Sequence, residues 1–118
     1  MTDLWEVDVT CPDADTAAAI AHACVAERLA ACAQVWPGLR SLYRWQGAIA
    51  DDPEVALRLK TTSARFEALA ARIRALHPYE VPAIQAVAVV AATPDFADWV
   101  RAETTPTAAD PGDGNAPA

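Results

Sequence analysis

The sequence predicts an α+β fold of the ferredoxin-like type, with two helices on one face of an antiparallel sheet. Hydrophobic patterns run in the order strand, helix, strand, strand, helix, strand, and a short helix follows them. The two middle strands form one long, bent hairpin. We expect a single domain over 1–103 and a disordered tail over 104–118, because the tail contains no large apolar residue.

The composition is that of a globular protein. Of the 118 residues, 53% are hydrophobic and 21% are charged. The net charge of −7 and the pI near 4.6 disfavour nucleic acid and anionic membranes as partners. No apolar run approaches the roughly 20 residues of a spanning helix, and no basic segment precedes an apolar one at the start. We therefore expect a cytoplasmic protein.

Three cysteines, Cys11, Cys24 and Cys32, are present. Their number is odd, and none of them forms the close pair of a zinc knuckle or a thioredoxin-like site. Reduced thiols in a cytosol-like compartment are therefore the preferred interpretation.

The spacing of apolar residues predicts the first strand and then the first helix. Apolar and polar residues alternate over 5–10, which indicates a strand with one apolar face. Asp13 and Asp15 then supply the acceptors and negative charge that suit a helix N-terminus. Helical spacing continues over about 14–29, and it places Cys24 on the buried side as a small core residue.

The hairpin begins with an extended segment over 32–45. Pro37 and Gly38 interrupt this segment, and we interpret them as a bulge or bend on a sheet edge rather than a break between two strands. A tight turn at 46–47 follows. Regular alternation over 55–60 predicts the second strand of the hairpin, after an acidic, proline-containing connection.

The second helix is expected over 66–76, where apolar residues recur at i, i+3, i+4 and i+7. The hydroxyl residues at 61–63 are its candidate caps, and Pro78 ends it. The nearly continuous apolar run at 83–91 predicts a strand covered on both faces. Thr93 caps a last helix, which carries three large apolar residues on one side: Phe96, Trp99 and Val100.

The face of the sheet opposite the helices is expected to carry Glu6 and Asp8. The hairpin adds Trp36, Tyr43 and Trp45, which is more aromatic surface than a lone small domain exposes. We therefore predict an oligomer in which these rings are packing anchors at the subunit interface, in preference to a cofactor cage.

The segment His77–Pro82 combines an imidazole, a phenol, a carboxylate and two prolines. The prolines make it a stiff connector, which suits a binding site and equally suits the clean end of a helix. The imidazole of His77 has three open roles: metal binding, pH sensing, or a hydrogen bond across a subunit interface.

Four motifs together resemble the CutA-type divalent-cation tolerance proteins: Glu27–Cys32, Ser41–Gly47, Lys60–Thr62 and His77–Pro82. The resemblance covers about 7–101. It implies a compact homotrimer similar in fold to the PII signalling trimers, with the hairpin embracing neighbouring subunits. It also implies a role in tolerance to divalent metals, notably copper.

A soft ion such as copper prefers thiolate and imidazole ligands, so Cys11, Cys32 and His77 are the candidate metal ligands. Glu80 and Asp8 are weaker oxygen donors. Cys32 has a second interpretation, as a small residue buried where the first helix passes into the next strand.

The resemblance also exposes a departure. In some relatives the proposed ligands are a thiol near the end of the first strand and two adjacent histidines before the proline. Here the pair is Leu76 and His77, and the thiol is Cys11, beside the turn. We therefore expect weaker metal binding within one subunit.

The expected function is that of a non-enzymatic, homotrimeric metal-tolerance protein that binds copper or a similar ion weakly. The alternative is a PII-like regulatory module that binds a small anion in an intersubunit cleft formed by Lys60, His77, Tyr79 and Glu80. A third interpretation is a stable trimer that acts through protein partners. Catalysis by Cys32 with His77 as base is disfavoured, since no nucleophile-elbow or glycine-rich motif accompanies them.

Overall fold

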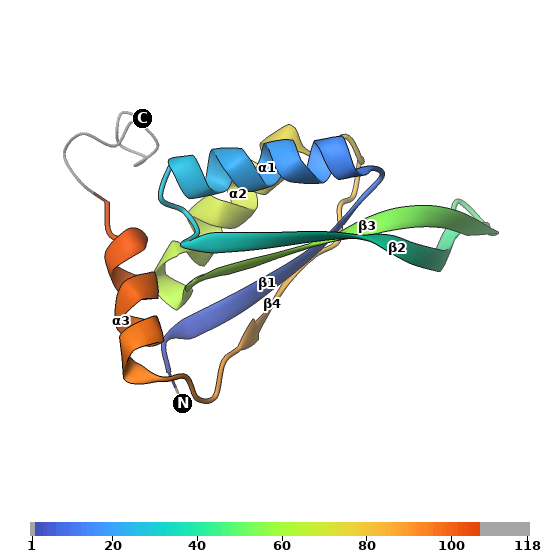
Figure 1. Cartoon of the computed structure of the whole chain (residues 1–118). Coiled ribbons are helices and arrows are strands. Elements are labelled where there is room, and N and C mark those ends of the chain that lie inside the picture. Colours follow the sequence, from blue (N-terminus) through green and yellow to red (C-terminus); the bar gives the residue numbers. More distant parts are fainter. Residues whose placement is uncertain (1, 107–118) are drawn as a thin grey trace.

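The computed structural model describes residues 2–106 and confirms the ferredoxin-like α+β fold (Figure 1). The helices and strands follow one another in the predicted order, and a 3₁₀ turn, η1 (Ser63–Arg65), precedes the second helix. The other elements are β1 (Leu4–Cys11), α1 (Ala14–Ala26), β2 (Cys32–Trp45), β3 (Ala48–Thr62), α2 (Phe66–Leu76), β4 (Ile84–Ala88) and α3 (Pro94–Glu103).

The sheet has the strand order β2-β3-β1-β4, and all neighbouring strands are antiparallel. Helices α1 and α2 lie on one face of this sheet, and α3 lies at one end (Figure 1). We call the opposite face the open face. The core between the two helices and the sheet includes Val7, Val9, Ile20, Leu57, Leu59, Leu69 and Ile73.

Helix α1 begins as predicted and ends earlier than predicted. The Asp13 carboxylate accepts a hydrogen bond from the Thr16 N–H at 2.7 Å. The helix ends at Ala26 because Arg28 adopts a left-handed conformation with φ of 61°. The N–H groups of Leu29 and Ala30 then both donate to the Cys24 carbonyl.

Strand β2 is the single bent strand that the sequence predicts, with a bulge between Trp36 and Leu39. The predicted start of β3 is wrong: the strand begins at Ala48, and the expected connection at 51–53 pairs with β2. A proline is tolerated there because β3 has a neighbour on only one side. We call residues 39–54 the arm; it extends past the end of β1, where Cys11 pairs with Val55.

The predicted hydroxyl caps of the second helix are wrong. Neither η1 nor α2 has a side-chain cap hydrogen bond, and Thr61 and Thr62 belong to β3. The Thr61 hydroxyl instead donates to the Leu29 carbonyl at 2.7 Å. This bond ties β3 to the turn that follows α1.

Strand β4 is shorter than predicted, and in one chain it is not covered on both faces. It lies at the edge of the sheet, and Val87 is exposed, as is Val90 beyond its end. The apolar run predicted that both faces of this strand are buried, and in a single chain they are not.

Helix α3 packs against the sheet end through Ala97 and Val100, which form a small second core with Leu4 and Ala31. Phe96 and Trp99 stack on each other, with ring centroids 6.0 Å apart, and each is about two-fifths exposed. The predicted Thr93 side-chain cap is absent, although Thr93 is the N-cap residue.

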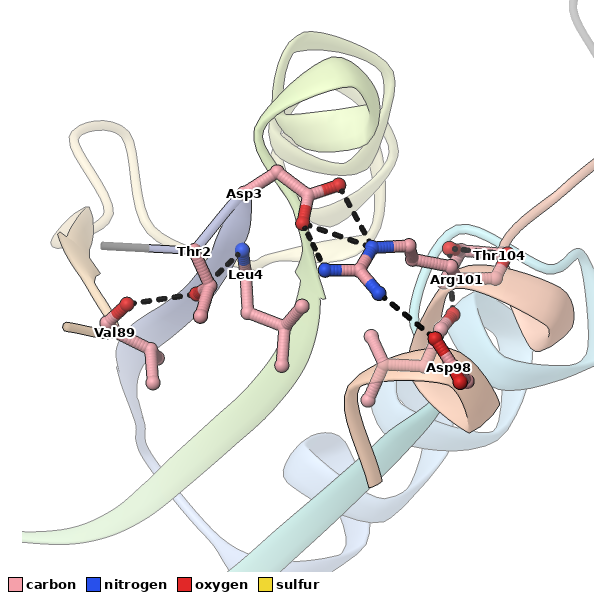
Figure 2. Close-up of polar contacts among 8 residues, drawn as sticks. Thr2, Asp3, Leu4, Val89, Asp98, Arg101 and Thr104 are labelled. Atoms are coloured by element: carbon pink, nitrogen blue, oxygen red, sulfur yellow. Dashed lines mark hydrogen bonds and ion pairs between the residues drawn. The ribbon is translucent and has the colours of Figure 1, made fainter. Parts of the chain in front are cut away.

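Polar contacts fasten α3 to the start of β1 (Figure 2). The Arg101 guanidinium pairs with Asp3 at 2.9 Å and with Asp98 at 3.0 Å. The Thr2 hydroxyl donates to the Val89 carbonyl at 2.7 Å and so joins the segment after β4 to the N-terminus (Figure 2).

The expected boundary between domain and tail falls on the C-cap of α3. Thr104 is buried, and its hydroxyl donates to the Val100 carbonyl at 2.8 Å. Residues 107–118 of the expected tail lie outside the described residues. No helix among residues 2–106 has the length and apolar character needed to cross a membrane.

Candidate functional site

His77 is the C-cap residue of α2, and Pro78 directs the chain away from the helix. His77 is only 7% exposed. The Tyr79 N–H donates to Nδ1 at 3.2 Å, so the ring proton lies on Nε2, which donates to the Thr10 carbonyl at 2.8 Å. Both ring nitrogens of the neutral imidazole are therefore engaged within the chain.

Tyr79 connects the His77–Pro82 segment to the arm. Its ring lies 4.7 Å from the His77 ring, and its hydroxyl donates to Glu54 Oε2 at 2.7 Å. Burial, and next the bond to Glu54, raise the pKa of the Tyr79 phenol. The phenol therefore stays a proton donor at physiological pH.

A pocket of about 770 Å³ lies between the arm and the His77–Pro82 segment. Glu54 lines it and is only 7% exposed, so this carboxylate stands at the edge of the interior. The other lining residues come from the arm, from β1 and from the segment after α2: Thr10, Arg40, Ser41, Leu42, Tyr43, Trp45, Pro78, Tyr79, Glu80, Val81 and Ala83.

The Cys11 thiol is fully buried at the end of β1, next to the Thr10 carbonyl that His77 contacts. Burial, and then the negative charges of Glu54 and Asp13, raise the pKa of this thiol to about 11. Cys11 and His77 therefore lie on adjoining segments, but the thiol stays protonated near neutral pH.

Cys32 lies away from these two residues. It pairs with Lys60, and Lys60 pairs with Glu6, five residues before Cys11 on β1. Strand and sheet spacings place the two cysteines about 19 Å apart. They also face opposite sides of the sheet, since side chains alternate along β1. One chain therefore does not bring Cys11 and Cys32 to a common metal ion.

Lys60 also lies apart from the pocket. It shares the open face with Glu54, but six residues separate them on β3, or about 20 Å. Its ammonium contacts Gln34 at 3.0 Å and Glu6 at 3.8 Å. Of the four residues predicted for an intersubunit cleft, Tyr79 and Glu80 line this pocket within one chain, and Lys60 and His77 do not.

The second oxygen donor predicted for a metal, Asp8, is already paired. Arg58 lies 2.8 Å from Asp8 and 3.0 Å from Glu6. The same guanidinium lies 5.3 Å from the centroid of the Trp36 ring. Among residues 2–106, no group of three or more His, Cys, Asp or Glu side chains is arranged to hold a metal ion.

The predicted interface aromatics all lie on β2. Trp36, Tyr43 and Trp45 are each about two-fifths exposed, at 39%, 41% and 43%. The Tyr43 hydroxyl donates to Asp52 at 2.6 Å, and this bond raises the pKa of the phenol. Tyr43 and Trp45 lie on the arm, and Trp36 lies before it, next to the bulge.

Glu54, Arg40 and Thr10 line the pocket, and no sequence motif marks them as site residues. Each is a polar residue of an ordinary strand pattern, and only the length and register of the arm bring them to the His77–Pro82 segment. No signal in the sequence marks Glu54, because a polar residue at that position fits the regular alternation of 54–60.

Comparisons with known proteins agree with this geometry. The family described as CutA1 divalent ion tolerance protein matches residues 6–103. The divalent-cation tolerance protein CutA of Thermus thermophilus is 46% identical over 96 residues, which cover 81% of this chain and 93% of that protein. The human protein CutA is 42% identical over the same share of this chain, which spans only 54% of the human protein.

Solved structures show the same fold. CutA from Xylella fastidiosa superposes with a TM-score of 0.86 at 39% identity, covering 88% of this chain and all of that one. The Thermus thermophilus protein gives a TM-score of 0.84 at 44% identity, over 86% of this chain and 99% of that one. This chain therefore belongs to the CutA1 divalent ion tolerance protein family.

Proposed function

We propose that this chain forms a non-enzymatic homotrimer that takes part in tolerance to divalent metal ions and binds copper or a similar ion weakly. The main support for this proposal is the exposed apolar surface of the arm. Leu42 and Ile49, on this projecting hairpin, are about two-thirds exposed, and the aromatic rings of Tyr43 and Trp45 lie beside them in sequence. An apolar surface of this extent marks a protein interface.

Unpaired strand edges support the same assembly. Strands β2 and β4 are the outer strands of the sheet, and β4 adds the exposed Val87. Native proteins cover such edges or pair them with another chain. A neighbouring subunit supplies that cover in the proposed homotrimer.

The metal role rests on Cys11 and His77, the two soft donors that lie on adjoining segments. A copper ion at Cys11 must displace the thiol proton, and at His77 it must displace one of two hydrogen bonds. Both requirements weaken binding. Cys32 joins such a site only as a ligand from a neighbouring subunit.

Titration of the metal-free protein with Cu(I) and with Cu(II) tests this role. Saturable, weak Cu(I) binding is expected. As long as the pH is below the pKa of the Cys11 thiol, the affinity should increase by about tenfold for each unit by which the pH is raised. Cys11→Ala and His77→Ala each weaken binding, whereas Cys24→Ala, at a buried thiol elsewhere, does not. Absence of saturable binding, or unchanged binding in a Cys11→Ala/His77→Ala variant, contradicts the metal role.

The alternative, a regulatory module that binds a small anion, has less support. Glu54 and Glu80 line the pocket, and its one basic lining residue, Arg40, is held by Asp51 in two hydrogen bonds of 2.9 and 2.8 Å. An anion there would face uncompensated carboxylates.

We also propose a cytoplasmic location. Cys11, Cys24 and Cys32 are all free thiols, as expected in a reducing compartment. A relative from Archaeoglobus fulgidus, with a TM-score of 0.84, is described as a periplasmic divalent cation tolerance protein. Fractionation of cells that express the full chain decides between the two compartments.

A further inference from the structure

Glu54 is a buried carboxylate without a cation beside it. Within residues 2–106, the Tyr79 phenol is the one side chain that hydrogen-bonds to it, and that bond uses Oε2. No lysine or arginine of the described chain pairs with Glu54. A buried charge is ordinarily balanced by an opposite charge or by several hydrogen bonds, so Glu54 lacks a complement within one chain.

The pocket into which Glu54 opens has aromatic walls. Tyr43 and Trp45 line it from the arm, and Tyr79 lines it from the other side. Positively charged groups bind to the faces of such rings, and a nearby carboxylate adds to that attraction. The pocket volume of about 770 Å³ lies within the range of small-molecule sites.

The charge of the lining selects against other ligands. Arg40 is already neutralised by Asp51, so Glu54 and Glu80 leave the pocket negative. A divalent metal requires more oxygen, nitrogen or sulfur donors than the described residues gather here. An organic cation with an aliphatic stem satisfies both the carboxylate and the rings.

We propose that the pocket between the arm and the His77–Pro82 segment binds a small organic cation, an alkyl amine or a guanidinium, with Glu54 as its counter-ion. Tyr43, Trp45 and Tyr79 enclose the aliphatic stem. This site is separate from the proposed copper ligands, because neither Cys11 nor His77 lines the pocket.

Calorimetric titration of the full chain with three probes tests the proposal: agmatine, n-pentanol as a neutral alkyl control, and glutarate as an anionic control. Agmatine is expected to bind saturably, and the two controls are not. Glu54→Gln keeps an acceptor for the Tyr79 hydroxyl and weakens agmatine binding by roughly 30-fold or more. Glu67→Gln, on the exposed side of α2, leaves agmatine binding unchanged.

The ligand series needs no variant, so it remains decisive if Glu54→Gln does not fold. Equal binding of agmatine and n-pentanol, or binding of glutarate alone, overturns the proposal. Light scattering in the same solutions tests whether a second copy of this chain, rather than a small cation, fills the pocket. If agmatine does not bind and Glu54→Gln lowers the oligomer mass, a second copy of this chain fills the pocket and the proposal is wrong. Copper titration reports on different residues, so either result stands without the other.

Discussion

At the scale of single residues, His77 is held by two hydrogen bonds that its own chain supplies. One joins Nε2 to the Thr10 carbonyl, and the other joins the Tyr79 N–H to Nδ1. These contacts fix the loop after α2 against the end of β1. The imidazole is therefore a structural link as well as a candidate ligand.

Replacement of this imidazole should destabilise the fold. His77→Ala removes the hydrogen bonds that the imidazole makes with the Thr10 carbonyl and the Tyr79 N–H, and we expect the free energy of unfolding to fall by about 1–3 kcal/mol. Denaturant unfolding at a fixed protein concentration measures the change. Glu80→Ala, an exposed change in the same segment, is the control and should cost no more than about 0.5 kcal/mol. Equal losses in both variants would refute the structural role of the imidazole.

The three thiols should differ in reactivity because they differ in burial. Burial raises the pKa of Cys11 to about 11 and that of Cys24 to about 12, whereas Cys32 is partly exposed. Since the thiolate is the reactive form, iodoacetamide should modify Cys32 first in the native protein. Mass spectrometry of the peptides identifies the site, and denatured protein, with all three modified, is the control. Faster modification of Cys11 or Cys24 would contradict their burial.

At the scale of elements, the arm depends on a tight turn with two left-handed residues. Gln46 has φ of 48° and Gly47 has φ of 82°, as in the two-residue turns that match the twist of a hairpin. Nothing lies within 4 Å of the position a Gly47 Cβ would take. Any cost of a side chain there therefore comes from the backbone alone.

Substitutions in this turn should have opposite effects. Gly47→Ala is expected to lower the free energy of unfolding by about 1–2 kcal/mol, because alanine is strained at this φ. Gln46→Gly should leave it unchanged or raise it by a few tenths to about 1 kcal/mol, since glycine relieves the same strain at Gln46. Thermal or denaturant unfolding gives both values. A stabilising Gly47→Ala would show that the turn has another conformation.

Helix α3 should depend more on packing than on its ion pairs. Val100 is fully buried, so Val100→Ala is expected to lower the free energy of unfolding by about 2 kcal/mol. The Arg101 pairs with Asp3 and Asp98 are exposed, and Arg101→Ala should cost less than about 1 kcal/mol. Comparison of the two variants by denaturant unfolding checks the order, and the reverse order would contradict it.

The regular spacing of apolar residues made most helices and strands predictable. The ends of the strands were not predictable, because they depend on which strands pair. Helix α2 was located over 66–76 because one stripe of apolar residues fits it. The start of β3 was missed because Asp51-Asp52-Pro53 has the composition of a turn. Its extended form depends on β2, whose Arg40 binds Asp51 and whose Tyr43 binds Asp52.

The candidate site was predictable in part for the same reason. The His77–Pro82 segment stands out by residue type, and it does line the pocket with Tyr79 and Glu80. Its partner Glu54 could not be identified, because their contact depends on where the arm begins. Lys60, which was predicted for the intersubunit cleft, lies about 20 Å from Glu54 on the same strand. It would therefore line the cleft only as a residue of a neighbouring subunit.

At the scale of the whole molecule, the single chain leaves much apolar surface exposed. Leu42 and Ile49 on the arm, Val87 on β4 and Val90 beyond it are all about half exposed or more. The main core, by contrast, is completely closed around Leu57 and Leu59. The proposed homotrimer would cover both this exposed set and the free strand edges.

Multi-angle light scattering of the purified full chain tests this assembly most directly. The proposed homotrimer should have a mass three times the 12.5 kDa of one chain, and a lower mass when Leu42 and Ile49 are both replaced by aspartate. Val25→Asp, an exposed change on α1, is the control and should leave the mass unchanged. A wild-type mass of 12.5 kDa at micromolar concentration would contradict the homotrimer and the role proposed for the arm.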